Sequence, residues 1–185
     1  MDTLKNVRVA IIATDGFEEA ELIEPLRALK DSGADVEVLS PKAGSIQGFK
    51  HFDKSKTVKV DRELHQARPE DYDAIVLPGG ALNADQARMD RSVQQFIRTF
   101  DQAGKPLAVI CHAPWELISA NVVRGRRLTS YHTIQDDVRN AGGNWVDQEV
   151  VVDRNWVTSR QPSDLPAFNR EMVKLFATAG AGVHR

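Results

Sequence analysis

The chain has 185 residues, 42% of them hydrophobic and 27% charged, enough for one domain that buries roughly 70% of the surface its unfolded chain exposes. The formal net charge of −2 and the pI near 6.2 lack the basic excess of proteins that bind nucleic acid or anionic membranes. A single cysteine excludes an intramolecular disulfide, no apolar run approaches the ~18 residues of a membrane span, and no signal-peptide pattern precedes Val7. We therefore expect one cytoplasmic domain over residues 1–185, with no specific nucleic-acid or membrane partner.

The first half of the chain predicts one β-α-β unit followed by a polar segment. Residues 7–13 are apolar and mostly β-branched, which indicates a buried strand. Residues 18–30 place leucines at i, i+4 and i+7, as an amphipathic helix does, and residues 35–39 form the next strand. The lysine- and glycine-containing segment that runs to about Lys56 predicts a solvated loop, with a short strand over residues 57–60 beyond it.

Strands and helices continue to alternate in the second half. The predicted elements are a strand over 73–80 ending in a glycine turn, a helix over 93–103, a strand over 107–110, a short helix over 114–120, extended pieces over 146–153 and 155–159, and a helix over 163–179. This alternation, with several strands apolar throughout, predicts an α/β fold whose parallel sheet is covered on both faces. Sites in such folds lie at the carboxyl ends of the strands. Asp15–Glu21, Pro78–Gly80 and Cys111–His112 all follow strands, so we expect them to share one edge.

Cys111 stands at the junction of a buried strand and a short helix. Free cysteine often packs as a small hydrophobic residue, but this position favours a reactive role. A sharp strand-to-helix turn would expose its sulfur at the sheet edge, as a nucleophile elbow exposes serine. The following helix N-terminus would lower the thiol pKa and favour the thiolate. We therefore interpret Cys111 as the nucleophile.

His112 and the Gly79-Gly80 pair are candidate partners of that sulfur. His112 is a candidate base or proton donor on a tight elbow, although a surface histidine at a helix start is the plain alternative. Two glycines free the backbone of Gly79 and Gly80 to turn N–H groups inward as an oxyanion hole, unless they form only a loop turn.

Four glutamates cluster at the start of the first helix: Glu18, Glu19, Glu21 and Glu24. Compensation of the helix dipole accounts for most of them. A helical wheel places Glu19 nearest the leucine stripe and Glu21 well off it, but Pro25 should distort the first turns. Periodicity therefore does not choose a functional glutamate.

No metal site or cofactor is expected. One cysteine cannot supply a thiolate cluster, phosphate-binding glycine motifs are absent, and the histidines show no paired spacing. They are His51, His65, His112, His132 and His184.

Several segments together resemble the ThiJ/PfpI superfamily, in the branch of PfpI-type intracellular proteases and bacterial general stress proteins. They are Asp15–Leu22, Val76–Gly80, Ala108–Pro114, Leu117–Ala120, Arg124–Arg126, Thr129–Tyr131 and Trp145–Asp153. The resemblance implies a flavodoxin-like three-layer α/β sandwich related to class I glutamine amidotransferases. It also implies a homodimer or a higher homo-oligomer.

The resemblance assigns roles that the pattern leaves open. It implies that Cys111 is the elbow nucleophile, that a protonated Glu21 faces it, and that His112 is the adjacent histidine. Asp85 matches the acid that orients this histidine, a position often Glu and sometimes supplied by a neighbouring subunit. Tyr131 matches a pocket residue, and we place Gly79, Gly80 and Glu18 with it. Ala113 stands where the family frequently has Gly, and the loop that carries Asp85 is one residue longer than in some relatives.

Three functions are consistent with these residues. The leading hypothesis, implied by the resemblance, is a stress-associated glyoxalase or deglycase whose sulfur adds to small reactive carbonyls or glycated substrates, with Glu21 and His112 moving protons. The first alternative is an intracellular cysteine peptidase that uses Cys111, His112 and an acid. The second is a redox sensor or chaperone whose Cys111 is oxidised to sulfinic acid beside Glu21.

Overall fold

A computed structural model describes residues 3–180, and its centre is a seven-stranded sheet in the order β11-β12-β8-β7-β1-β3-β6. In chain order its strands are β1 (Arg8–Ile12), β3 (Asp35–Ser40), β6 (Arg62–Glu63), β7 (Ala74–Leu77), β8 (Leu107–Ile110), β11 (Val150–Asp153) and β12 (Trp156–Ser159). Every neighbouring pair is parallel except β11 and β12. The predicted α/β fold with a mainly parallel sheet is therefore confirmed.

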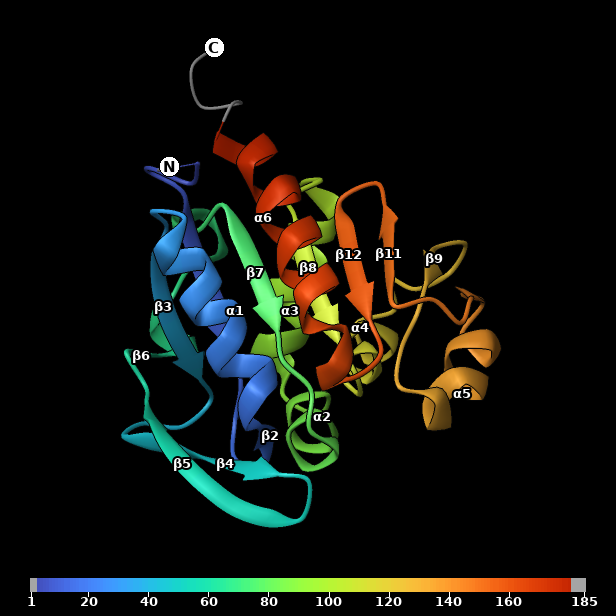
Figure 1. The fold of residues 1–185 in the computed structure, drawn as a ribbon, viewed down its shortest axis with the longest axis horizontal. Coiled ribbons are helices and arrows are strands. Elements are labelled where there is room, and N and C mark those ends of the chain that lie inside the picture. The colour runs from blue at the N-terminus through green and yellow to red at the C-terminus, as the bar shows by residue number, and fades with distance from the viewer. Residues whose placement is uncertain (1–2, 181–185) are drawn as a thin grey trace.

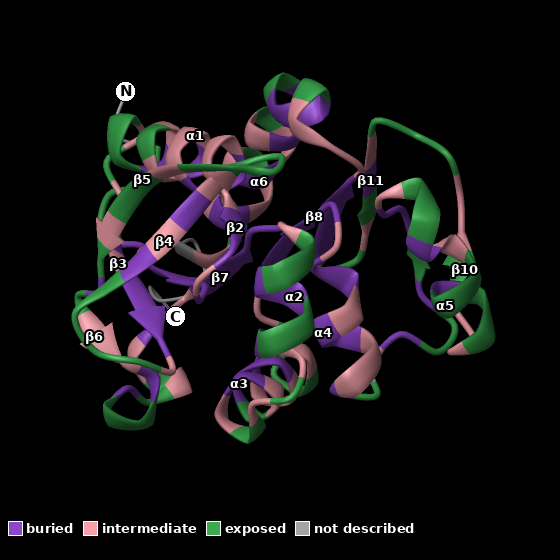
Figure 2. Cartoon of the chain, turned by 90° about the horizontal axis from the view of Figure 1, so that it is seen from below, coloured by how far each residue is buried: buried purple, intermediate pink, exposed green. Residues whose placement is uncertain are grey.

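Helices cover both faces of this sheet. They are α1 (Glu19–Asp31), α2 (Ala81–Ala87), α3 (Arg91–Gln102), α4 (Pro114–Ser119), α5 (Gln135–Asn140) and α6 (Leu165–Gly180). Figure 1 shows α1 and α6 in front of the sheet, and Figure 2 shows α3 and α4 below it, with the buried strands between the layers. The strands β3, β7 and β12 end at the same edge, where α2 also lies.

The alternating directions of the side chains on β1 explain why both faces need a cover. Val9 and Ile11 join the apolar cluster under α1 and α6, whereas Ala10 and Ile12 join the cluster under α3 and α4. All four side chains are fully buried. A strand that is buried on both faces must be apolar throughout, which is the pattern that predicted it.

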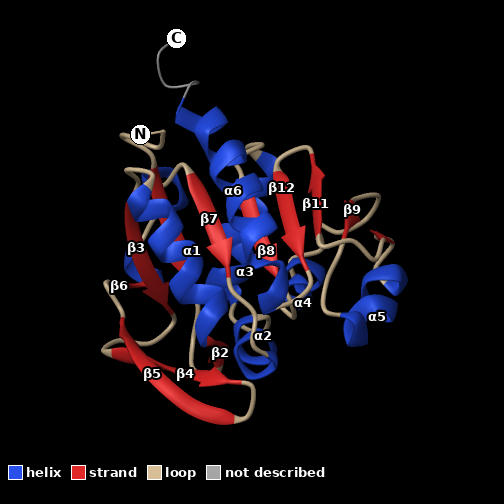
Figure 3. Ribbon diagram, in the orientation of Figure 1, coloured by secondary structure: helices blue, strands red, loops and turns tan. Residues whose placement is uncertain are grey.

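The polar segment before residue 60 is a hairpin, so the predicted loop is wrong. It consists of β4 (Ser45–Lys50) and β5 (Asp53–Lys59), and β4 also pairs with β2 (Phe17–Glu18), which gives a separate three-stranded sheet. Figure 3 shows it beyond the carboxyl edge of the main sheet. Only Ile46 and Gly48 of β4 are buried, and the Phe17 ring lies so near Gly48 that an added Cβ would come within 2.8 Å of it. Because most of the hairpin is exposed and charged, it lacks the apolar alternation that indicates a strand.

Other differences are local. The sequence does not predict α2, α5 or the parallel pair β9 (Arg127–Leu128) and β10 (Asn144–Trp145). The extended piece predicted from residue 146 becomes a strand only at Val150, and α6 begins after a 3-10 turn over Pro162–Asp164. Pro25 does not break α1, which runs through it. Within residues 3–180, none of the helices is long and apolar enough to cross a membrane.

Candidate active site

Cys111 occupies a strained turn at the carboxyl end of β8. Its φ is +64°, a left-handed conformation that costs a non-glycine residue about 1–3 kcal/mol. Two backbone hydrogen bonds hold it there: its N–H donates to the Ser159 carbonyl at 3.0 Å, and its carbonyl accepts the Tyr131 N–H at 2.8 Å. Neighbouring segments thus stabilise the turn, which has the geometry of a nucleophile elbow.

Cys111 is 7% exposed. Polar groups from three segments of the chain surround its sulfur. His112 Nδ1 lies 3.2 Å from Sγ. The backbone N–H groups of Gly80 and His112 also face the sulfur. The elbow therefore places an imidazole nitrogen and two N–H donors around one thiol.

Glu21 of α1 approaches the sulfur from the other layer. It is fully buried, and neither of its carboxyl oxygens has a hydrogen bond of standard geometry. Burial first, and the charge of Glu18 second, raise the pKa of Glu21 to about 8, while the nearby Cys111 thiol and Gly79 N–H act in the opposite direction. Glu21 therefore keeps its proton at neutral pH and can donate it.

The expected lowering of the thiol pKa is wrong for this chain. Burial first, and the Glu21 carboxyl second, raise the pKa of Cys111 above its ordinary value, against the effect of the N–H groups. Burial and then His132 lower the pKa of His112, so its imidazole is neutral at pH 7 and can accept a proton. The arrangement is thus a thiol paired with a neutral imidazole and a protonated carboxyl.

The two glycines have different roles. Gly79 fills the space between Glu21 and Cys111, since an added Cβ would lie 2.2 Å from Glu21 Oε2 and 2.5 Å from Cys111 Cβ. Its N–H faces Glu21, so of the two glycines only Gly80 directs an N–H group at the Cys111 sulfur, and the second such N–H is that of His112. Gly80 has φ +93°, and an added Cβ would come within 2.3 Å of the Gly16 carbonyl oxygen. Neither position has room for a side chain.

Of two other predicted site residues, Glu18 lies near the Cys111 sulfur and Asp85 does not. Glu18 lines the cavity that opens at the Cys111 sulfur, and its carboxylate accepts the His51 N–H at 3.0 Å. Asp85 is exposed on α2, and within residues 3–180 its carboxylate makes no hydrogen bond or ion pair. The described chain therefore brings Glu18 to the site but does not bring Asp85 to its own His112.

A cavity of about 610 Å³ opens at the sulfur. It is lined by Glu18, Glu21, His51, Phe52, Gly80, Ala81, Cys111, His112, Tyr131, Gln161, Pro162 and Ser163. Its volume suits a small ligand. The sequence interpretation missed the hairpin tip at His51 and Phe52, for which no signal existed. It also missed Gln161–Ser163, which the rule about carboxyl strand ends could have found, because they follow β12.

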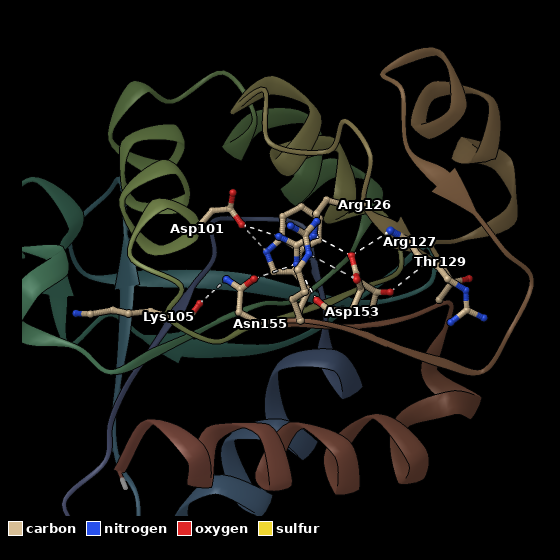
Figure 4. A network of polar contacts seen from close by, with 10 residues as sticks. Asp101, Lys105, Arg126, Arg127, Thr129, Asp153 and Asn155 are labelled. Atoms are coloured by element: carbon tan, nitrogen blue, oxygen red, sulfur yellow. Dashed lines mark hydrogen bonds and ion pairs between the residues drawn. The ribbon is translucent and has the colours of Figure 1, made fainter. Parts of the chain in front are cut away.

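A larger cavity, of about 860 Å³, lies at the opposite end of the strands beside Lys105 and Arg126. Figure 4 shows the Arg126 guanidinium in ion pairs with Asp101 and Asp153. Each pair has an N–O distance of 2.9 Å. In the described part of the chain, neither cysteine nor histidine lines this cavity. Among residues 3–180, no three His, Cys, Asp or Glu side chains are grouped to hold a metal ion, and His184 lies outside this range.

The fold and the site define an α/β protein with a cysteine elbow, in which the thiol lies between an imidazole and a buried carboxyl. The chain belongs to the DJ-1/PfpI family, whose model matches residues 7–175. It is 49% identical to a deglycase of Pyrococcus abyssi over 91% of this chain and 99% of that protein. It is 43% identical to protein/nucleic acid deglycase 2 of Escherichia coli over 91% and 96% of the two chains. A two-domain protein of Anabaena variabilis with DJ-1/ThiJ/PfpI-like and ferritin-like domains matches with a TM-score of 0.88 and 32% identity, over 95% of this chain and 50% of that one.

Proposed function

We propose that this chain is a cysteine-dependent enzyme that acts on reactive carbonyls, as a glyoxalase or as a deglycase of glycated substrates. The observation that carries the proposal is the Cys111 thiol between the neutral His112 imidazole and the protonated Glu21 carboxyl, at a cavity of about 610 Å³. The similarity to proteins named deglycase supports it. A small aldehyde needs a nucleophile and two proton carriers, and these residues supply them.

The first step is addition of the sulfur to the aldehyde carbon. As the S–C bond forms, His112 Nδ1 takes the thiol proton over 3.2 Å. The carbonyl oxygen becomes an alkoxide that the Gly80 and His112 N–H groups stabilise and that Glu21 protonates, which gives a hemithioacetal. Burial of Glu21 has a function here, because an ionised carboxylate could not donate this proton.

The second step releases the product. For methylglyoxal, the Glu21 carboxylate removes the C–H proton of the hemithioacetal, and the protonated His112 gives its proton to the ketone oxygen, which forms an enediol. Glu21 then returns its proton to the former ketone carbon while His112 takes the hydroxyl proton of the sulfur-bearing carbon, so that the sulfur-bearing carbon is oxidised and its neighbour reduced. This leaves a thioester on Cys111. Water hydrolyses it to lactate and restores the thiol. For a glycated amine or thiol, the Cys111 sulfur displaces the amine or thiol from the hemiaminal or hemithioacetal carbon. The C–N or C–S bond of the substrate breaks, the leaving group takes a proton from Glu21, and the same hemithioacetal on Cys111 remains.

The proposal is tested by turnover of methylglyoxal to lactate in the wild type and in Cys111→Ala. We expect the variant to lose activity by at least about 1000-fold, since no second cysteine exists to replace the nucleophile. A peptide substrate run alongside, and intact-mass analysis after mild peroxide, test the two alternatives. Turnover that survives in Cys111→Ala contradicts the mechanism. Peptide cleavage without methylglyoxal turnover would establish the peptidase instead, and oxidation without either turnover would establish the redox sensor.

We further propose that Asp85 meets His112 of a second copy, as the resemblance implies. Asp85 and Leu82 lie on α2, and Met89 follows this helix by two residues. Leu82 and Met89 are 57% and 76% exposed, which is the apolar surface that a partner would cover. Mixing Cys111→Ala with Asp85→Ala tests the idea. In a dimer, random exchange of subunits should restore about one quarter of the wild-type rate, because one site in each mixed dimer is complete. If Asp85 acts within its own chain, the mixture stays as inactive as its parts.

A further inference from the structure

Aromatic rings surround the His112 imidazole. Tyr131 stacks on it with ring centroids 4.8 Å apart and an interplanar angle of 28°, and Trp115 lies at 5.4 Å and 63°. Its Nδ1 faces the Cys111 sulfur at 3.2 Å. Within residues 3–180 no carboxylate hydrogen-bonds to this imidazole. Within one chain the imidazole is therefore held by the two ring contacts and by the Cys111 sulfur.

Trp115 is itself held from two sides. Its indole Nε1 donates to Asp137 Oδ2 on α5 at 2.7 Å. The guanidinium carbon of Arg88 lies 5.3 Å from the centre of the indole ring, and Arg88 Nε donates to Ser119 Oγ at 3.0 Å. A hydrogen bond and a cation–π contact thus hold the indole of Trp115 in addition to its packing.

We propose that Trp115, held by Asp137, is a positioning residue that keeps His112 Nδ1 on the Cys111 sulfur. The inference rests on the proposed function only in taking His112 as the base of Cys111. An imidazole without a fixed partner rotates about its side-chain bonds and spends part of its time away from the thiol. Trp115 and Tyr131 restrict this rotation, so removal of the indole reduces the fraction of molecules in which proton transfer can occur.

The chain allows a test that does not depend on turnover. Cys111 is its single cysteine, so the rate of alkylation by iodoacetamide reports this thiol without background. We expect Trp115→Ala to slow alkylation at pH 7 by about 2- to 12-fold, the factor that corresponds to the energy of one aromatic pair. The pH at which the alkylation rate rises should move to a higher value. Asp137→Ala should slow alkylation by a smaller factor. Asp137→Asn should keep the wild-type rate, because its amide oxygen still accepts the indole N–H.

Trp145 provides a matched control. Its indole Nε1 donates to Ser130 Oγ at 2.9 Å and the Arg139 guanidinium lies 5.0 Å from its ring centre, but it makes no ring contact with His112 in the described chain. Trp145→Ala should therefore alkylate at the wild-type rate. Equal slowing in both tryptophan variants, or a wild-type rate and pH profile in Trp115→Ala, would overturn the inference. If Trp115→Ala does not fold, the exposed Asp137 pair decides, since a wild-type rate in Asp137→Ala contradicts the anchor.

These outcomes separate the inference from the proposed function. If the wild type does not turn over methylglyoxal but its alkylation rate still depends on Trp115, the proposed function is contradicted and the role of Trp115 as a positioning residue is supported. If the wild type turns over methylglyoxal but Trp115→Ala does not change the alkylation rate, only the inference about Trp115 is contradicted.

Discussion

Replacement of Glu21 by Gln tests the proposed protonation of the site through the stability of the fold. Glutamine keeps the shape of the protonated acid but cannot ionise. In the wild type the folded state holds its proton up to about pH 8, whereas the unfolded carboxyl titrates near 4.5. The raised folded-state pKa therefore destabilises the wild type. The penalty is absent below about pH 4.5, grows by about 1.4 kcal/mol per pH unit and levels off above about pH 8.

The expected magnitude follows from these two pKa values. Between about pH 5 and pH 7.5 the penalty for Glu21 grows by about 3 kcal/mol, so Glu21→Gln should gain that much stability relative to the wild type over this range. Any cost of fitting the amide is the same at both pH values and cancels. Urea unfolding followed by tryptophan fluorescence measures the difference.

The control is Glu24→Gln, which removes one half-exposed carboxylate from the same helix. A stability difference between Glu21→Gln and the wild type that is equal at both pH values would refute the reasoning, because Glu21 would then ionise as an ordinary carboxyl does. Carbonyl turnover should be lost in the same variant that is stabilised. That combination is typical of a group kept for function at the expense of the fold.

Three further substitutions have defined outcomes. Gly79→Ala places a Cβ 2.2 Å from Glu21 Oε2, so we expect it to destabilise the fold by about 1–3 kcal/mol and to slow turnover by about 100-fold; a variant as active as the wild type would show that the site can expand. Glu116→Leu removes a fully buried carboxyl that has no hydrogen bond within the described chain and whose pKa burial raises, so urea unfolding at pH 7.5 should show a gain of about 1–3 kcal/mol. A less stable Glu116→Leu protein would contradict this. Arg126→Met breaks both ion pairs to Asp101 and Asp153 and should cost about 3 kcal/mol, while the rate of Cys111 alkylation stays at the wild-type value because the network lies at the other end of the strands. A changed alkylation rate would argue against that separation.

The local pattern predicts the strands and their order of appearance well. Apolar residues on β1, β7 and β8 indicate buried strands because a central parallel strand has no solvent-facing side. The hairpin β4–β5 has one fully buried apolar residue and many lysines, so nothing local distinguishes it from a loop. Its two strands pair with each other, and β4 also pairs with β2, whose Phe17 ring lies against Gly48.

The sequence by itself predicted the position of Cys111 at the sheet edge, since a cysteine directly after an apolar strand lies where α/β sites form. Periodicity did not choose among the glutamates, and only the family resemblance indicated Glu21. The helical wheel favours Glu19, whereas the structure buries Glu21 beside the sulfur and leaves Glu19 paired with Lys50. The tertiary structure also decided the direction of the thiol pKa and the contact between Trp115 and His112. The reason is the same in each case. Desolvation and ring contacts depend on segments distant in sequence that meet only after the layers pack, whereas the position of a residue at a strand end is a property of the chain itself.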